Sequence, residues 1–353
     1  MNRVPPWRRC ARHKGRNHVN DQAILTSVSP APAAAAGDPR FPNFFILGAA
    51  KAGTTTLYEY LCTHPRIFLS PVKEPQFFSH DEVYERGIAY YLRTFFAGAE
   101  KSAVRGEATP HYLYFEKAAQ RIAASAGGLP VRFIVMLRDP VERAYSLYWN
   151  MVAEGIETLP FEAALEQEGE RSRDPELQRS GSVSIQYVDS GMYAKQLRRY
   201  LRYFGREQFL VVFLQDLHAN PRQVLDQICD FLAIPRFDSL PKRHNANGAS
   251  TPRSPTLHRL LRKPHWIKRH VGRCLPEAFK YKIALGLAAA NRKRLAYPPL
   301  SGEIAARLRV RFAPDVRALE QLCGRRLSEW LPSSDSDSER ISSVDSQEMT
   351  HAP

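Results

Sequence analysis

The order of apolar and polar residues along the chain predicts strands that alternate with helices. Short apolar runs that end at a glycine or a polar turn are typical of buried parallel strands. They occur at 44–47, 67–70, from 104, 131–137 and 209–216. Stretches between and after them have helical spacing or helix-boundary residues, at 54–63, 83–96, 116–126, from 140, 184–204 and 221–232. This alternation favours an α/β fold, with a parallel, doubly wound sheet and helices on both faces.

The pattern changes at both ends of the chain and after Lys242. Residues 1–40 are rich in arginine, proline and alanine, and residues 332–353 are rich in serine and acidic residues, so we expect two disordered tails, one basic and one acidic. After Lys242 we expect basic helices and no further strands. We therefore predict one domain over 41–331, in which a C-terminal helical block closes over the sheet.

The positive charge is concentrated in one region. The formal net charge is +14, and residues 251–330 hold 18 basic and 5 acidic residues, whereas residues 41–250 are neutral overall. This basic block can face an anionic ligand, an acidic acceptor or, as a peripheral contact, a membrane surface, or it can be a solvated helical face.

Two other features limit the class of protein. The five cysteines are scattered and suggest neither a disulfide framework nor a zinc site. The longest apolar run, at 283–290, is too short to span a bilayer, and the basic N-terminus lacks an apolar signal-peptide core. We expect a soluble, cytoplasmic protein.

The stretch FFILGAAKAGTTTL, residues 44–57, combines a buried strand, a loop of small residues and a helix start. Such a junction leaves backbone N–H groups pointing out of a helix N-terminus, where they bind phosphate or sulfate. Lys51 adds a mobile positive charge. The alternative is an ordinary strand-to-helix connection that happens to carry a lysine.

A second basic residue, Arg138, follows the clearest buried strand. Ligands of open α/β sheets bind beyond the carboxyl ends of the strands, so Lys51 and Arg138 together suggest a ligand with two anionic groups. Glu74 and Glu107 are further candidates for this edge. Alternatively, Arg138 forms an ion pair with Asp139 or Glu142. A kinase P-loop would carry its lysine after the last glycine, whereas Lys51 precedes Gly53 by two residues.

Several motifs, in matching order over about residues 44–231, resemble the sulfotransferases that use 3′-phosphoadenosine 5′-phosphosulfate (PAPS). GAAKAGTTTL looks like their 5′-phosphosulfate loop, and LRDPVERAYSLYW looks like their 3′-phosphate motif. KEPQFF, GEATPHYLY and GMYAKQLRRYLRYF resemble the heparan-sulfate branch of that family. The resemblance implies a P-loop NTPase-like fold and no metal requirement.

The resemblance also implies roles for individual residues. Lys51, Gly53, Thr54, Thr55 and Thr56 would hold the 5′-phosphosulfate, with Lys51 stabilising the charge on the leaving oxygen. Arg138 and Ser146 would bind the 3′-phosphate. Glu74 would be the base that deprotonates the acceptor hydroxyl, although a solvated loop acid is the alternative. A loop at 244–254, which contains Arg253, lies where family members close on the nucleotide.

One departure concerns the acceptor. That branch usually has a lysine where this chain has Ala108, so a positive charge expected near the acceptor is missing. We expect sulfuryl transfer from PAPS to a hydroxyl, most simply on a carbohydrate or glycolipid, with small molecules also open. Two rivals are a small-molecule kinase that uses ATP and a basic protein whose 251–330 block binds nucleic acid. The neutral 41–250 segment argues against nucleic acid as a partner.

Overall fold

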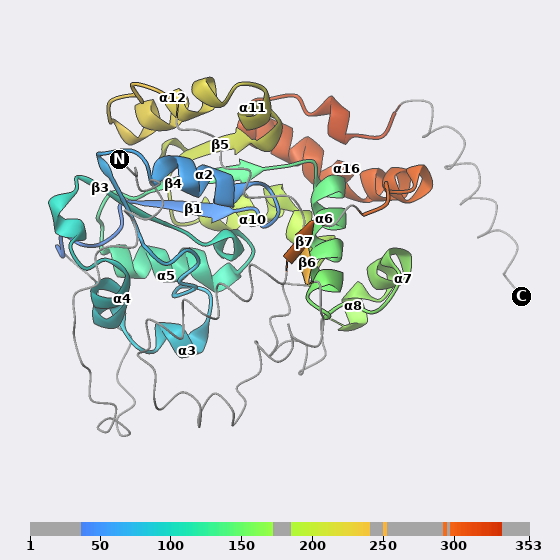
Figure 1. Ribbon diagram of the computed structural model, residues 1–353, viewed down its shortest axis with the longest axis horizontal. Coiled ribbons are helices and arrows are strands. Elements are labelled where there is room, and N and C mark those ends of the chain that lie inside the picture. The colour runs from blue at the N-terminus through green and yellow to red at the C-terminus, as the bar shows by residue number, and fades with distance from the viewer. Residues whose placement is uncertain (1–36, 172–184, 241–249, 253–291, 295–296, 334–353) are drawn as a thin grey trace, which may run out of the picture. The chain divides into compact units, whose positions relative to one another are not determined.

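The structure is a computed structural model that describes residues 37–171, 185–240, 250–252, 292–294 and 297–333 (Figure 1). The chain divides into two compact units built from interleaved segments. The first unit comprises residues 1–139, 192–245 and 315–326, and the second comprises residues 140–191, 246–314 and 327–353. The expectation of one domain over 41–331, with a tail on either side, stays a prediction.

A five-stranded parallel sheet forms the centre of the first unit (Figure 1). Its strands stand in the order β2-β3-β1-β4-β5, so β1 lies between β3 and β4, and the chain reverses its winding direction there. The register pairs Phe44 with Gly106 on one side and with Arg132 on the other. The strand bounds are β1 Phe44–Gly48, β2 Ile67–Leu69, β3 Val104–Ala108, β4 Arg132–Leu137 and β5 Phe209–Phe213.

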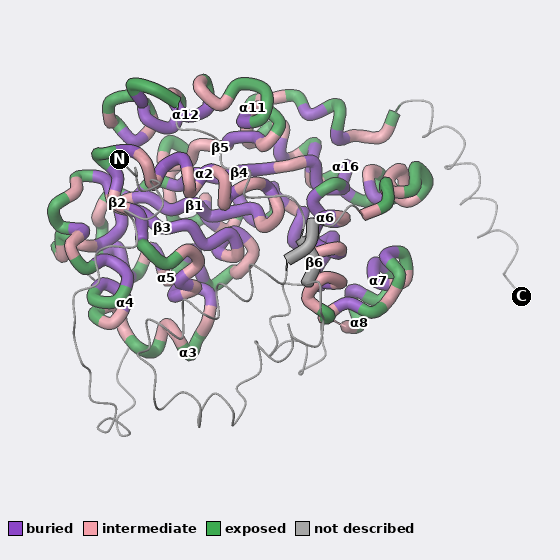
Figure 2. Tube along the Cα trace, viewed as in Figure 1, coloured by how far each residue is buried: buried purple, intermediate pink, exposed green. Residues whose placement is uncertain are grey.

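Side chains of neighbouring strand residues point to opposite faces of a sheet. In this sheet both faces are covered. Phe44 and Ile46 join an aliphatic core that also includes Leu57 and Leu225. Phe45 faces the other way and stacks on Phe133 with ring centroids 5.9 Å apart. Figure 2 shows β1, β3 and β4 as largely buried. The predicted parallel sheet with helices on both faces is confirmed.

The helices of the first unit follow the predicted order with local differences. Their bounds are α2 Thr54–Leu61, α3 Asp81–Tyr84, α4 Ile88–Phe95, α5 Glu116–Ala126, α10 Tyr193–Tyr200, α11 Leu214–Ala219 and α12 Pro221–Leu232, with 3-10 turns η1 Ala99–Lys101, η2 Pro110–Leu113 and η5 Arg206–Gln208. The single helix expected at 83–96 is interrupted at Gly87, whose φ of 82° is left-handed. The helix-rich stretch expected at 184–204 contains the short α10.

The last strand ends three residues earlier than expected. β5 stops at Phe213, and Leu214 begins α11, so Asp216 lies on a helix and not on an acidic strand. The apolar run continues to Leu214, and periodicity alone does not distinguish a strand from a buried helix start. On α11, Asp216 forms an ion pair with Arg325.

The second unit holds α6 Pro140–Ala153, α7 Phe161–Glu166, α8 Glu168–Arg171 and η4 Asp189–Gly191. The fully buried guanidinium of Arg143 donates to the carbonyl oxygen of Tyr187. The carboxylate of Glu168 accepts the N–H groups of Val188 and Asp189. These bonds tie the segment 187–189 to α6 and α8.

The expectation of no strands after Lys242 is wrong. β6 Ser250–Pro252 pairs antiparallel with β7 Arg292–Arg294. These short polar segments have no apolar alternation, and a pairing across some forty residues leaves no local signal. The expected C-terminal helix is present as α16 Gly302–Cys323, which is followed by η7 Ser328–Trp330. In the described residues, no helix has the length and apolar character needed to cross a membrane. About half of the basic block, residues 253–291 and 295–296, lies outside the described residues.

Candidate functional site

The loop between β1 and α2 is the candidate anion-binding loop, and its glycine is set by its surroundings. Gly53 has a φ of 89°, and a Cβ there would lie 2.5 Å from a methyl group of Leu214, so only glycine fits. The N-cap residue Gly53 gives α2 no side-chain cap, and the first turn of α2 holds no acid. The positive end of the helix dipole therefore lies at this loop without a negative side chain in the first turn, an arrangement that favours a negatively charged ligand.

Lys51 and Arg138 are close together, as the sequence predicted. Lys51 is held in a left-handed conformation with φ 67°. Its carbonyl oxygen lies 3.5 Å from Nη1 of Arg138, at the long limit of a hydrogen bond. The hydroxyl of Tyr193, at the start of α10, donates to the carbonyl oxygen of Arg138 at 2.8 Å. The Arg138 side chain thus reaches the backbone of the Lys51 loop at the carboxyl ends of neighbouring strands β1 and β4.

Glu74 lies at the same edge of the sheet. Its N–H donates to the carbonyl oxygen of Ala108, the last residue of β3, at 3.0 Å. Because Ala108 pairs with Ile46 of β1, the loop that carries Glu74 lies next to the strand that leads to Lys51. The Glu74 carboxylate forms an ion pair with Lys73, and 35% of its side chain is exposed. The predicted base is therefore fixed in its backbone and accessible in its carboxylate.

The loops that carry Lys51 and Glu74 contain several residues with strained backbone conformations. Among the described residues, four that are not glycine have a positive φ, namely Lys51, Glu74, Gln76 and Ala233. Three of the four lie in the Lys51 and Glu74 loops. Non-glycine residues in this conformation cost energy and persist where the surroundings hold them, commonly at functional sites.

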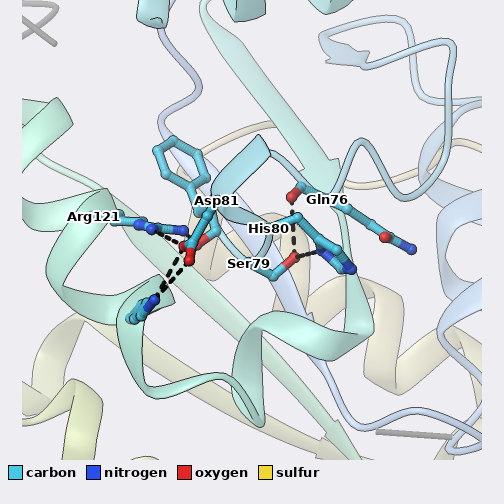
Figure 3. Close-up of polar contacts among 7 residues, drawn as sticks. Gln76, Ser79, His80, Asp81 and Arg121 are labelled. Atoms are coloured by element: carbon cyan, nitrogen blue, oxygen red, sulfur yellow. Dashed lines mark hydrogen bonds and ion pairs between the residues drawn. The ribbon is translucent and has the colours of Figure 1, made fainter. Parts of the chain in front are cut away.

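Polar side chains with mutual hydrogen bonds and an ion pair follow Glu74 along the loop (Figure 3). Oγ of Ser79 donates to the carbonyl oxygen of Gln76 at 3.0 Å and lies 2.9 Å from Nδ1 of His80. Burial lowers the pKa of His80, which favours the neutral imidazole. Asp81, the next residue, pairs with Arg121 of α5. The ion pair fixes the start of α3 to α5. The loop that begins at Glu74 is therefore held at its start by the bond to Ala108 and at its end by Asp81.

Glu107, in the strand next to the Glu74 loop, has a carboxyl group whose burial the sequence did not reveal. Glu107 of β3 is fully buried and accepts hydrogen bonds from the hydroxyls of Tyr91, Thr109 and Tyr112. Burial raises its pKa to about 7. The Tyr112 hydroxyl also accepts the N–H of Phe78 at 3.2 Å. Glu107 is therefore a buried support under the Glu74 loop and not a ligand-facing acid at the sheet edge.

The other residues predicted to bind the donor lie in several parts of the chain. Thr54 is buried, and Thr55 and Thr56 are half-buried in the first turn of α2. Ser146 lies on α6 in the second unit, with 9% of it exposed, so its pairing with Arg138 stays a prediction. Arg253 lies outside the described residues. Within the described ranges, no three His, Cys, Asp or Glu side chains form a group that could hold a metal ion.

Comparison with known proteins identifies the family. The family model described as "Sulfotransferase domain" matches residues 41–260. Mouse heparan sulfate glucosamine 3-O-sulfotransferase 3B1 is 29% identical over 333 residues, which cover 92% of this chain and 76% of that protein. The human 3B1 enzyme is 30% identical over 78% of this chain and 69% of its own length.

A solved structure agrees with these matches. The sulfotransferase from Alicyclobacillus acidocaldarius is 30% identical, superposes with a TM-score of 0.59, and covers 82% of this chain and 98% of its own. The family match contains the Lys51 loop, Glu74 and Arg138. The chain therefore belongs to the sulfotransferase domain family, whose members use PAPS as sulfuryl donor, and it is a sulfotransferase.

Proposed function

We propose that the chain transfers the sulfuryl group of PAPS to a hydroxyl of a carbohydrate, with Glu74 as general base and the Lys51 loop as the donor site. The observation that carries the proposal is the common sheet edge. The Glu74 loop is hydrogen-bonded to the end of β3, next to the strand that leads to Lys51. A base and an anion-binding loop at one edge are what in-line transfer of an anionic group to a hydroxyl requires.

The residues of the loop fit the donor. PAPS, when bound, supplies an electrophilic sulfur and a phosphate leaving group. The N-terminus of α2, whose first turn holds no acid, and the ammonium of Lys51 would bind the negative charge that collects on that phosphate. Arg138, with Ser146 as its proposed partner, would bind the second phosphate. The two basic groups at neighbouring strand ends match a ligand with two anionic ends.

Glu74 would act on the acceptor. Its carboxylate takes the proton of the attacking hydroxyl as the new oxygen–sulfur bond forms and the bond from sulfur to the phosphate oxygen breaks. The ion pair with Lys73 orients the carboxylate. General-base catalysis of this kind contributes about 10²–10⁴ in rate.

The acceptor class rests on the relatives. The mouse and human proteins compared above are named for 3-O-sulfation of glucosamine in heparan sulfate. The loop beside Glu74 is lined by polar groups such as Gln76 and His80, as a site for a hydroxyl-rich ligand would be. We propose a glucosamine-containing or similar saccharide as acceptor.

Two measurements test this proposal. Isothermal titration calorimetry compares adenosine 3′,5′-bisphosphate (PAP), the desulfated donor, with ATP and magnesium. We expect PAP to bind and ATP to bind at least about tenfold more weakly, and the reverse order would favour a kinase. Transfer from radiolabelled PAPS is then compared for heparan sulfate, a sterol and a phenol. Labelling of the phenol or the sterol in preference to the saccharide would overturn the acceptor class while leaving the donor assignment intact.

A further inference from the structure

His111 stands on a rigid segment beside the proposed base. It belongs to η2, which begins two residues after β3, and Thr109 donates its N–H to the carbonyl oxygen of Ile46 in β1 at 3.2 Å. The carbonyl oxygen of His111 accepts the N–H groups of Tyr114 and Phe115. Its neighbours Tyr112 and Leu113 are fully buried. The backbone of His111 is therefore fixed at the same sheet edge as Glu74.

The imidazole of His111 is half-buried and lies within electrostatic reach of Glu74, Lys73 and His80. Glu74 and Lys73 come from the loop after β2, and His80 comes from the residue before α3. The backbone bond between Glu74 and Ala108 holds that loop against the start of the η2 segment. His111 and the proposed base thus belong to two segments that are fastened together.

The ring nitrogens of the half-buried His111 have no hydrogen-bond partner among the described residues. Two other histidines differ: Nε2 of His64 lies 2.8 Å from the carbonyl oxygen of Pro235, and Nδ1 of His80 lies 2.9 Å from Oγ of Ser79. A ring nitrogen that no protein group engages can form a hydrogen bond with a bound ligand.

The charge state of the ring limits what it can bind. Burial is the main cause that lowers the pKa of His111, and Lys73 and His80 lower it further, whereas Glu74 raises it. The ring is therefore neutral at pH 7 and offers one donor and one acceptor nitrogen. That pair of roles matches a hydroxyl group, which also donates and accepts.

We propose that His111 binds the acceptor by a hydrogen bond to a hydroxyl adjacent to the one that Glu74 deprotonates. His111 then selects acceptors that carry two neighbouring hydroxyls, as a sugar ring does, over acceptors with one. The inference rests on the proposed function and names the group that would distinguish a saccharide from a simple alcohol. His111 orients the acceptor, and the proton still moves to Glu74.

Steady-state kinetics of variants test this role. We compare His111→Ala and His111→Gln with the wild type on a heparan sulfate oligosaccharide and on cyclohexanol. Loss of one hydrogen bond predicts a roughly tenfold higher KM of His111→Ala for the oligosaccharide, with kcat and the weak transfer to cyclohexanol nearly unchanged. His111→Gln, which keeps a donor and an acceptor, should recover part of the loss. An unchanged KM, or an equal loss on both acceptors, would overturn the inference.

His64→Gln is the matched control. His64 is a buried histidine that packs edge-on against Phe237 and bonds to the backbone within the unit. Its replacement should lower the melting temperature and leave the KM for the oligosaccharide unchanged. If His64→Gln raises that KM as much as His111→Ala does, the effect is structural and the proposed role of His111 is wrong.

A measurement without turnover separates this inference from the proposed function. The imidazole proton signals of His111 are assigned by their absence from the NMR spectrum of His111→Gln, and the oligosaccharide is titrated into the PAP-loaded protein. We expect a saturable shift of the His111 signals. Failure to bind PAP would contradict the proposed function. Binding of PAP and sulfation of the oligosaccharide with unmoved His111 signals would contradict the inference alone.

Discussion

The N–H of Glu74 donates to the carbonyl oxygen of Ala108 across 3.0 Å, which places the acid of one loop at the end of a strand far from it in sequence. The bond holds Glu74 in a left-handed conformation with φ 63°. Because the bond uses only the backbone, the Glu74 carboxylate stays available for chemistry. The geometry therefore predicts that the Glu74 side chain can be changed without loss of the fold.

Glu74→Gln tests the general base. The amide has nearly the same shape as the carboxylate but accepts no proton, so we expect kcat to fall by about 10²–10⁴. PAP affinity, measured by calorimetry, should stay within about threefold of the wild-type value because the donor site is intact. Glu82→Gln, an exposed acid on the neighbouring α3, serves as the control. Turnover of Glu74→Gln near that of the control would exclude Glu74 as the base.

Lys51→Met tests the charge stabilisation at the donor loop. The methionine keeps much of the side-chain length and removes the ammonium, so we expect a loss of about 10²–10³ in kcat, as for other groups that stabilise charge in the transition state. The comparison variant is Lys101→Met, whose lysine is exposed in η1 before β3 begins, at the amino end of that strand. Rapid-quench measurement of labelled product reports the chemical step. Equal rates for the two variants would show that Lys51 has no part in transfer.

Arg138→Met is expected to weaken the donor first. Removing a charged hydrogen-bond donor from a phosphate costs about 1.5–3 kcal/mol, so the Kd for PAP should rise roughly 10- to 100-fold. Arg132, at the amino end of the same strand, donates to the carbonyl oxygen of Leu232 at 3.2 Å and provides the matched control. Arg132→Met should leave the Kd for PAP unchanged. A similar Kd for both variants would remove Arg138 from the donor site.

Glu107→Gln tests the buried support under the Glu74 loop. The pKa of Glu107 is raised from 4.5 to about 7 in the folded chain, so between these values the folded state holds a proton that the unfolded state has released. Its contribution to stability is present below about pH 4.5 and is lost as the pH rises to 7. A neutral glutamine removes this dependence.

The measurement is urea-induced unfolding of both proteins at several pH values. Relative to wild type, Glu107→Gln should become more stable as the pH rises from 5 to 8, by up to about 3 kcal/mol. Below pH 4.5 the difference should be constant and should report only the changed hydrogen bonds to the three hydroxyls. A difference that does not vary between pH 5 and 8 would show that Glu107 ionises normally in the folded chain.

The central sheet and the strand–loop–helix junction around Lys51 were predictable because their signals are local. Phe44 and Ile46 alternate with Phe45, and the small residues around Lys51 stand directly between an apolar run and a helix start. Buried strands and anion-binding turns need particular residues at adjacent positions, so the order of residues reveals them. The same locality predicted that Arg138 ends a strand, and the proximity of Arg138 to Lys51 then followed from the parallel sheet.

Other features depended on residues that are distant in sequence. Glu107 reads as an acid at a strand end, and only the packing of Tyr91, Thr109 and Tyr112 around it makes it a buried group with a raised pKa. The pairing of β6 with β7 carries no periodic signal in either segment. By itself the sequence determined which candidate residues follow successive strands along the chain: the Lys51 loop, then Glu74, then Arg138. The tertiary structure decided which groups are buried and which are free to react, including His111 beside Glu74, because burial and electrostatic contact are set by side chains that the chain brings together only when it folds.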